Sequence, residues 1–174
     1  LDADKQSGLV LVNTQYGDSG RFSYYIRMPN EQWKQISDYD DQIVQATFGA
    51  NSTLFLTSRA GAPRGQIIKL TPGNYSLEKA QVIIPEGKDT IVSTFFGHPP
   101  VVATPSCLYV TYQLGGPSEV RVFDYEGNQQ KGPEILPVSN VGQIIALGGD
   151  DILYQNSSYL EPPAWYMFEK ENEI

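Results

Sequence analysis

A pair of strand-like segments recurs along the chain, and this repeat constrains the fold more than any other feature. The first segment of the pair occurs four times, as Leu9-Val10-Leu11-Val12, Leu54-Phe55-Leu56-Thr57, Leu108-Tyr109-Val110-Thr111 and Leu153-Tyr154-Gln155-Asn156. Successive copies lie about 45, 54 and 45 residues apart, and the loop Gly97-His98-Pro99-Pro100 lengthens the middle spacing. Repeats of about 40 to 50 residues are typical of β-propeller blades.

A second apolar segment follows each copy after about 10 to 13 residues, across a turn that contains Gly or Pro. This spacing predicts a hairpin within each blade. Counting all runs rich in Val, Ile, Tyr, Phe and Thr, we expect strands at 8–16, 21–28, 33–37, 43–48, 53–59, 66–70, 81–84, 90–95, 107–114, 119–125, 134–138, 143–147, 152–159 and 164–169. The first group then lacks its leading strand and the last lacks its trailing one.

The predicted fold is therefore all-β, a propeller fragment of about three and a half four-stranded antiparallel blades. The blade segments are about 8–42, 43–89, 90–142 and 143–174. An antiparallel sandwich is the alternative, since its strands also follow one another closely, but a sandwich need not repeat in groups of four strands. The repeat predicts that Leu54, Leu56, Leu108, Val110 and Leu153 are buried between blades.

Composition excludes several classes of function. The net charge is −8 and the 12 basic residues are scattered, which argues against a nucleic-acid partner. No stretch is long and apolar enough for a transmembrane helix. Cys107 is the single cysteine, so a disulfide within the chain and a cysteine zinc site are excluded, and we expect no cofactor. The acidic pairs Asp40-Asp41 and Asp150-Asp151 lack the spacing of a calcium loop and are interpreted as solvated turns.

The run Gly17-Asp18-Ser19-Gly20 resembles the nucleophile motif of chymotrypsin-like proteases. Such an enzyme also needs a histidine base and an aspartate, but the only histidine, His98, lies in a Gly-Pro loop without the matching context. Gly, Asp and Ser are also the residues that a tight turn prefers. A Gly-x-Ser-x-Gly nucleophile elbow does not occur in the sequence. We therefore expect no catalytic residues in this chain.

The second to fourth repeats carry a more specific pattern. The second has Leu54-Phe55-Leu56-Thr57-Ser58-Arg59, then Ala62-Pro63-Arg64 and a new strand. The third has Val120-Arg121-Val122-Phe123-Asp124-Tyr125 followed by Ile135-Leu136-Pro137, and the fourth has Ser157-Ser158-Tyr159-Leu160 with Pro162-Pro163 and Trp165-Tyr166. In this order the segments resemble the β-propeller domain of the prolyl oligopeptidase family of serine peptidases.

The resemblance implies that the chain belongs to a longer peptidase that cleaves short peptides after proline in the cytoplasm. The Ser, Asp and His of that family belong to an α/β-hydrolase domain, which we expect as the missing partner of this chain. The propeller would exclude folded proteins, and its loops would shape the route of the peptide. In this sequence Tyr16, Asp18, Arg59 and Arg64 are the residues predicted to line that route.

Two further expectations concern partners. A free-standing propeller that binds another protein is the alternative function, and the sequence alone does not separate it from the peptidase. Because both ends of the predicted fragment leave sheet faces and strand edges uncovered, we also expect the chain to form a homo-oligomer.

Overall fold

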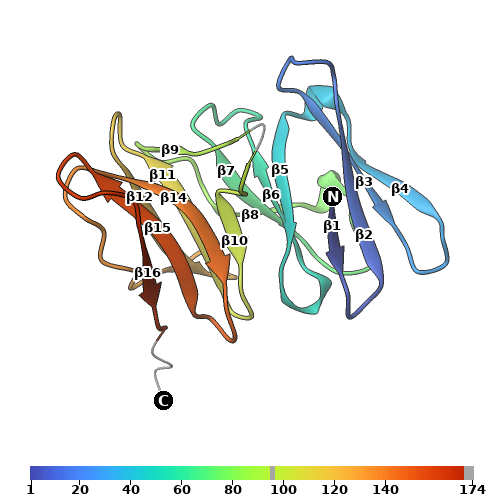
Figure 1. Cartoon of the computed structure of the whole chain (residues 1–174). Coiled ribbons are helices and arrows are strands. Elements are labelled where there is room, and N and C mark those ends of the chain that lie inside the picture. The colour runs from blue at the N-terminus through green and yellow to red at the C-terminus, as the bar shows by residue number, and fades with distance from the viewer. Residues whose placement is uncertain (95–96, 171–174) are drawn as a thin grey trace. The chain divides into compact units, whose positions relative to one another are not determined.

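The computed structural model describes residues 1–94 and 97–170 of the chain. It divides into two compact units, residues 1–87 and residues 88–174, and each unit is described by itself. Every unit contains two antiparallel sheets, whose strands are labelled in Figure 1. The prediction of an all-β propeller fragment is confirmed. No helix in the described part of the chain is long and apolar enough to cross a membrane.

The first sheet of unit 1 has four strands in chain order. They are β1 (Asp2–Asp4), β2 (Leu9–Gln15), β3 (Phe22–Arg27) and β4 (Trp33–Ser37). The expectation that this sheet lacks its leading strand is wrong, because β1 pairs with β2 along its whole length. An Asp-Ala-Asp segment has low strand propensity, so only the backbone pairing and the bonds of its carboxylates make it a strand.

The second sheet of unit 1 repeats this order. It contains β5 (Ile43–Phe48), β6 (Leu54–Ser58), β7 (Gln66–Leu70) and β8 (Gln81–Ile84). All four strands were predicted to within one residue, because each is an apolar run between Gly, Pro or polar turns. Short 3-10 turns, Tyr39–Asp41, Ala50–Ser52 and Leu77–Lys79, occur in the connections of the unit.

One hydrophobic core joins the two sheets of unit 1. Leu9, Leu11 and Ile26 of the first sheet are buried in the same cluster as Leu54 and Leu56 of the second. The side chains of these strands alternate between two faces, so each sheet presents one row of apolar residues to the other. The burial predicted for Leu54 and Leu56 is confirmed, and both are fully buried.

In the third sheet, which belongs to unit 2, two short strands take the place of a single first strand. Both β9 (Thr90–Ile91) and β10 (Val101–Ala103) pair with β11 (Cys107–Gln113), which is followed by β12 (Ser118–Asp124) and β13 (Gln129–Gln130). The strand predicted at 90–95 therefore ends at Ile91, and its residue 95 lies outside the described residues. The insertion between β9 and β10 accounts for the long middle spacing of the repeat.

The strand predicted at 134–138 does not form, and β13 takes the outermost position instead. Pro133 and Pro137 have no N–H to give to a ladder. Side chains of the fourth sheet satisfy the segment: Tyr154 donates its hydroxyl to the carbonyl of Glu134 (2.7 Å), and the amide oxygen of Asn156 accepts from the backbone N–H of Leu136 (2.9 Å). The segment is an extended connection that packs beside a sheet without joining it.

The fourth sheet has three strands in the described part of the chain, β14 (Ser139–Ala146), β15 (Ile152–Ser158) and β16 (Ala164–Phe168). Its core face packs against the third sheet through Ile144, Ile152 and Tyr154. The burial predicted for Leu108 and Val110 of the third sheet is confirmed, but the prediction for Leu153 is wrong. Leu153 lies on the opposite face from Ile152 and Tyr154 and is only half-buried.

Two ends can be distinguished in each unit (Figure 1). Because all strands are antiparallel, the loops that join the second and third strands of a sheet emerge at one end, which we call the hairpin end. The loops of the hairpin end are residues 16–21 and 59–65 in unit 1, and residues 114–117 and 159–163 in unit 2. The loops between the first and second strands emerge at the opposite end, which we call the turn end.

An aspartate ties the two sheets together at the turn end of each unit. In unit 1, Asp4 accepts hydrogen bonds from the hydroxyls of Ser7 (2.5 Å) and of Ser52 (2.6 Å), which lies in the β5–β6 connection of the neighbouring sheet. In unit 2, Asp150 accepts from Thr104 (2.7 Å) and from both the backbone and the hydroxyl of Ser106 (2.8 and 2.6 Å). These carboxylates work as clamps between consecutive sheets.

Candidate substrate-facing loops

The four residues predicted to line the peptide route all belong to the hairpin end of unit 1. Tyr16 and Asp18 lie in the loop between β2 and β3, and Arg59 and Arg64 lie in the loop between β6 and β7. The antiparallel order of the strands places both loops at the same end of their sheets (Figure 1). The prediction of their role is not tested by this placement.

The β2–β3 loop is a hydrogen-bonded turn. The backbone N–H and the hydroxyl of Ser19 both donate to the carbonyl of Tyr16 (3.1 and 2.6 Å). Gly17 has a φ of 56° and Gly20 a φ of 75°, a region that Gly adopts without strain. The Ser19 hydroxyl is therefore part of the local turn, in agreement with the interpretation of Gly17-Asp18-Ser19-Gly20 as a turn.

A cluster of aromatic and charged side chains holds the ring of Tyr16. The guanidinium of Arg21 lies over this ring at 4.7 Å from its centroid, and the ring of Tyr39 meets it edge-on at 5.5 Å. Arg21 also forms an ion pair with Asp40 (3.2 Å). The cluster presents an aromatic ring and a guanidinium together at the surface, a combination that can stack on planar groups.

Sequence reasoning missed Arg21, Tyr39 and Asp40 as members of this cluster. Tyr39 and Asp40 follow β4, on the far side of two strands from Tyr16, so no local spacing signals their proximity. The interpretation of Asp40-Asp41 as a solvated turn is correct for Asp40, but the carboxylate of Asp41 is bonded within the protein. Asp40 is highly exposed, while the Asp41 carboxylate accepts from the backbone N–H of Asp38 (2.7 Å) in a capping box.

The β6–β7 loop is held by the two arginines themselves. Arg59 donates to the carbonyl of Pro63 within the loop (2.7 Å). Glu86, which follows β8, accepts from the backbone N–H of Arg64 (2.5 Å), and the Arg64 guanidinium donates to the carbonyl of Gly87 (3.3 Å). Burial lowers the pKa of Arg59, and the nearby charge of Glu86 opposes that shift. The structure thus brings Arg59 and Arg64 together around Glu86, a residue that the sequence did not indicate.

Unit 2 carries a charged cluster near its own hairpin end. Arg121 on β12 forms ion pairs with Asp89 and with Glu119 (2.6 Å for the latter), and its guanidinium lies 4.2 Å from the ring centroid of Tyr112. Burial lowers the pKa of Arg121, but the hydrogen bonds to the two carboxylates outweigh burial and raise this pKa overall. Burial also raises the pKa of Tyr112 to about 12. Arg121 therefore stays protonated and the hydroxyl of Tyr112 stays neutral near neutral pH.

Among the described residues, no group of three or more His, Cys, Asp or Glu side chains could hold a metal ion. The carboxylates of Asp150 and Asp151 are bonded to protein donors, the latter to the backbone N–H of Lys170 (2.8 Å). Cys107 is a buried free thiol, and burial raises its pKa. A thiol of that kind is a poor nucleophile. The loops therefore present side chains that can bind a ligand.

The repeat of sheets, the loop pattern and the sequence agree with one family. The family model described as the prolyl oligopeptidase N-terminal beta-propeller domain matches residues 3–173. The chain belongs to the prolyl oligopeptidase family. The resemblance inferred from the Ala62-Pro63 and Pro162-Pro163 loops is thereby confirmed. Among curated proteins none matches the chain significantly.

Solved structures share the fold at low sequence identity. A prolyl endopeptidase, solved in a study of two such enzymes, superposes with a TM-score of 0.78 at 20% identity over 95% of this chain. Prolyl oligopeptidase B from Galerina marginata gives 0.74 at 12% identity over 97% of this chain. The propeller domain of the trilobed protease from Pyrococcus furiosus gives 0.63 at 9% identity, and the match covers 94% of this chain and 49% of that one. The chain spans 24% of the length of each of the first two proteins.

Proposed function

We propose that this chain is the access-controlling propeller part of a cytoplasmic serine peptidase that cleaves short peptides after proline. The observation that carries the proposal is the match of the prolyl oligopeptidase propeller model to residues 3–173, in a chain that folds as a propeller fragment. The peptide-bond chemistry would belong to an α/β-hydrolase domain elsewhere in the protein. The cytoplasmic location is part of the proposal and is supported by the family resemblance alone.

The chemistry of the loops supports a role in access. The hairpin end of unit 1 carries the ring of Tyr16 beside Arg21, together with the guanidinium groups of Arg59 and Arg64. Aromatic rings stack on proline and on peptide bonds, and guanidinium groups bind carbonyl oxygens and carboxylates. A rigid sheet scaffold fixes these groups, so a short peptide passing the loops would meet an ordered surface.

The test compares the full-length protein that contains this chain with the 174-residue chain alone. We expect the full-length protein to release the chromophore from a chromogenic Gly-Pro substrate and to be labelled by a fluorophosphonate. The isolated chain should do neither, because the Ser19 hydroxyl donates to the carbonyl of Tyr16 within its own turn. Labelling of the isolated chain that persists in Ser19→Ala would reveal a nucleophile that we have not identified.

Access control has its own test. The full-length protein should cleave a free Pro-containing decapeptide, and the same sequence placed in a loop of a stable folded domain should stay intact. Equal cleavage of both would contradict the access role. A full-length protein without peptidase activity or fluorophosphonate labelling would instead favour the alternative, a propeller that binds another protein.

A further inference from the structure

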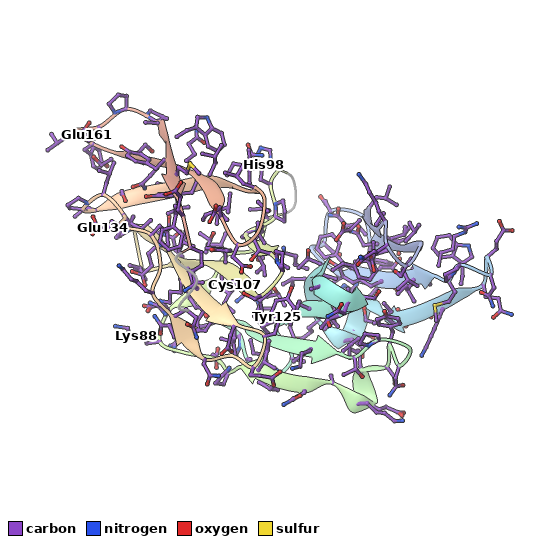
Figure 2. The ribbon with its side chains drawn as sticks, turned by 90° about the horizontal axis from the view of Figure 1, so that it is seen from below. Lys88, His98, Cys107, Tyr125, Glu134 and Glu161 are labelled. Carbon is purple, nitrogen blue, oxygen red and sulfur yellow. The ribbon has the colours of Figure 1, made fainter. Side chains whose placement is uncertain are left out.

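The gap between β9 and β10 leaves Thr111 of β11 opposite a loop. The two short strands pair with β11 on either side of this residue, and the chain between them loops out. Val92 donates its N–H to the carbonyl of Thr111 (2.9 Å), and the N–H of Thr111 donates to the carbonyl of Pro100 (2.9 Å). The β9–β10 loop therefore begins and ends beside Thr111. Figure 2 labels His98 in this loop.

The first strand of the fourth sheet is irregular as well. β14 has a bulge between Val141 and Ile144, where Gly142 and Gln143 have no partner residue on β15. A Cβ atom on Gly142 would lie 2.6 Å from Oε1 of Gln155, so a glycine here allows that carboxamide to lie close to the backbone. Bulges are over-represented beside functional sites, where they redirect side chains.

A hollow of about 270 Å³ lies between the β9–β10 loop and this bulge. Its polar lining consists of hydroxyl, imidazole and carboxamide groups, including those of Thr111, His98, Gln143 and Gln155. Each of these groups can donate a hydrogen bond. Among the described residues, no Asp or Glu side chain lines the hollow. The hollow therefore offers several donors with no carboxylate beside them.

The hydroxyl of Thr111 is a second, independent sign of a ligand. Thr111 lies on the same face of β11 as Cys107 and Tyr109. These two side chains belong to one core with Val141 of β14, so Thr111 also faces the fourth sheet. Thr111 is 4% exposed, and in the described part of the chain its hydroxyl oxygen has no hydrogen-bond partner. A buried hydroxyl without a partner costs stability, and an acceptor that enters the hollow would supply that partner.

We propose that this hollow binds the C-terminal carboxylate and the last side chain of a short peptide. A carboxylate accepts several hydrogen bonds at once, which suits a lining of donors. Val92, Pro100 and Val141 form an apolar wall for the side chain. The volume is below the range of about 300 to 1,000 Å³ that is typical of pockets for drug-sized ligands, so the ligand is about one or two residues long.

The lining favours a peptide terminus over a free amino acid. The ammonium group of a free amino acid would need an acidic partner, and the described lining contains none. Proline suits the last position, because the proposed peptidase leaves it at the C-terminus of its products. Binding goes beyond the proposed function and needs no peptidase activity, so each proposal can fail without the other.

Two-dimensional proton–nitrogen NMR of the 174-residue chain tests the binding directly. N-Acetyl-L-proline should shift the amide signals of Thr111, Gly142 and Gln143 in a saturable way. The neutral N-acetyl-L-prolinamide should bind about tenfold more weakly, the loss expected when a charge-assisted hydrogen bond is removed. Free L-proline should also bind more weakly. Equal binding of either control, no binding of N-acetyl-L-proline, or shifts confined to other parts of the chain would overturn the proposal.

Variants of the lining give an independent readout. Thr111→Val keeps the shape of the side chain and should weaken the binding of N-acetyl-L-proline about tenfold, without lowering the melting temperature, because only an unpartnered hydroxyl is lost. Gly142→Ala should also weaken binding, since the new Cβ displaces the carboxamide of Gln155. The matched control is Thr57→Val, at the corresponding buried position of β6, which should leave the affinity unchanged. Unchanged affinity in Thr111→Val and Gly142→Ala would contradict the assignment of the site.

Discussion

Leu56 and Leu153 both lie on the second strand of a sheet, but their surroundings differ. Leu56 on β6 is fully buried in the core that joins the two sheets of unit 1. Leu153 on β15 is half-buried, on the face that points away from the core of unit 2. The energetic contribution of a leucine depends on the atoms around it and on the cavity left when it is removed.

Replacing each leucine by alanine should separate the two environments. Leu56→Ala should lower the free energy of unfolding by about 2–5 kcal/mol, because a fully packed side chain leaves a cavity. Leu153→Ala should cost about 1 kcal/mol or less, as expected for a partly exposed side chain. Urea unfolding of the two variants, followed by circular dichroism, measures both values. Equal losses would mean that the face assigned to Leu153 is wrong.

The error for Leu153 has a simple physical origin. Side chains in a strand alternate faces, so an alignment of repeats that is wrong by one residue reverses the predicted face. The repeat aligns Leu9 with Leu54, yet both point into the same core from opposite sheets, so they are not equivalent positions. In β6 and β11 an alignment error of one residue would not change the predicted burial. Residues on both faces of these two strands are buried, including Phe55 and Tyr109.

The candidate site could be predicted only to the level of its loops. Arg64 was placed in a turn by the Gly and Pro signals around it, and the structure has it there, whereas Tyr16 and Arg59 end the predicted strands 8–16 and 53–59 and in the structure follow the last residues of β2 and β6. Their partners Tyr39 and Glu86 follow the outermost strand of each sheet. That proximity depends on how the connection folds back over the sheet, and no local pattern in the sequence encodes it.

At the scale of elements, backbone pairing overrides composition in two places. Strand β1 is polar and short, but it pairs with β2, and the carboxylate of Asp2 accepts from the N–H of Phe48 in the next sheet (3.1 Å). The apolar pattern of segment 134–138 predicts a strand, but the segment contains a proline, which has no N–H for a strand-pairing hydrogen bond. Side chains of β15 form hydrogen bonds with its backbone groups instead. Strong apolar runs such as β6 and β7 were predictable because both the pattern and the pairing favour a strand.

The aspartate clamps between sheets predict how stability depends on pH. The pKa of Asp4 is lowered, chiefly by the hydrogen bond from Ser52 and then by that from Ser7. Burial raises the pKa of Asp150, but hydrogen bonds from Ser106 and Thr104 outweigh it, and this pKa too is lowered. A carboxyl with a lowered folded-state pKa stabilises the fold above its unfolded value of about 3.9, and the contribution is lost as the pH falls through the folded value.

The free energy of unfolding should therefore fall as the pH drops below about 4, the range where unfolded carboxyls begin to bind protons. Replacing both clamps, in Asp4→Asn with Asp150→Asn, should reduce stability at pH 7 and flatten this decline. The matched control is Asp18→Asn, in the exposed β2–β3 loop. Urea titrations between pH 7 and pH 3 provide the comparison, and a decline as steep in the double variant as in the unsubstituted chain would show that other carboxyls cause it.

At the scale of the whole molecule, the last sheet leaves one face uncovered. Ile145, Leu153 and Met167 are paired across β14, β15 and β16 and form a row on that face, with Trp165 beside it. Trp165 is 48% exposed and Met167 is 55% exposed. Among the described residues β16 pairs only with β15, so its outer edge also presents unpaired backbone groups. The first sheet, by contrast, is completed by β1, which corrects the expectation of an open strand position at that end.

An isolated 174-residue chain has only another copy of itself to cover this face. Contiguous exposed apolar area and a free strand edge both favour association, since burying the row removes apolar surface from water and pairing the edge satisfies its N–H and C=O groups. We therefore predict a dimer or a higher oligomer at micromolar concentration, measured by sedimentation equilibrium.

Trp165→Glu with Met167→Glu should give a 19.3 kDa monomer, because charges on the face oppose its burial. Val82→Glu, at an exposed apolar residue of β8, is the control and should leave the oligomer intact. A monomer before any substitution would mean that the row is too small to associate, and loss of the oligomer in both variants would attribute it to net charge instead of to this face.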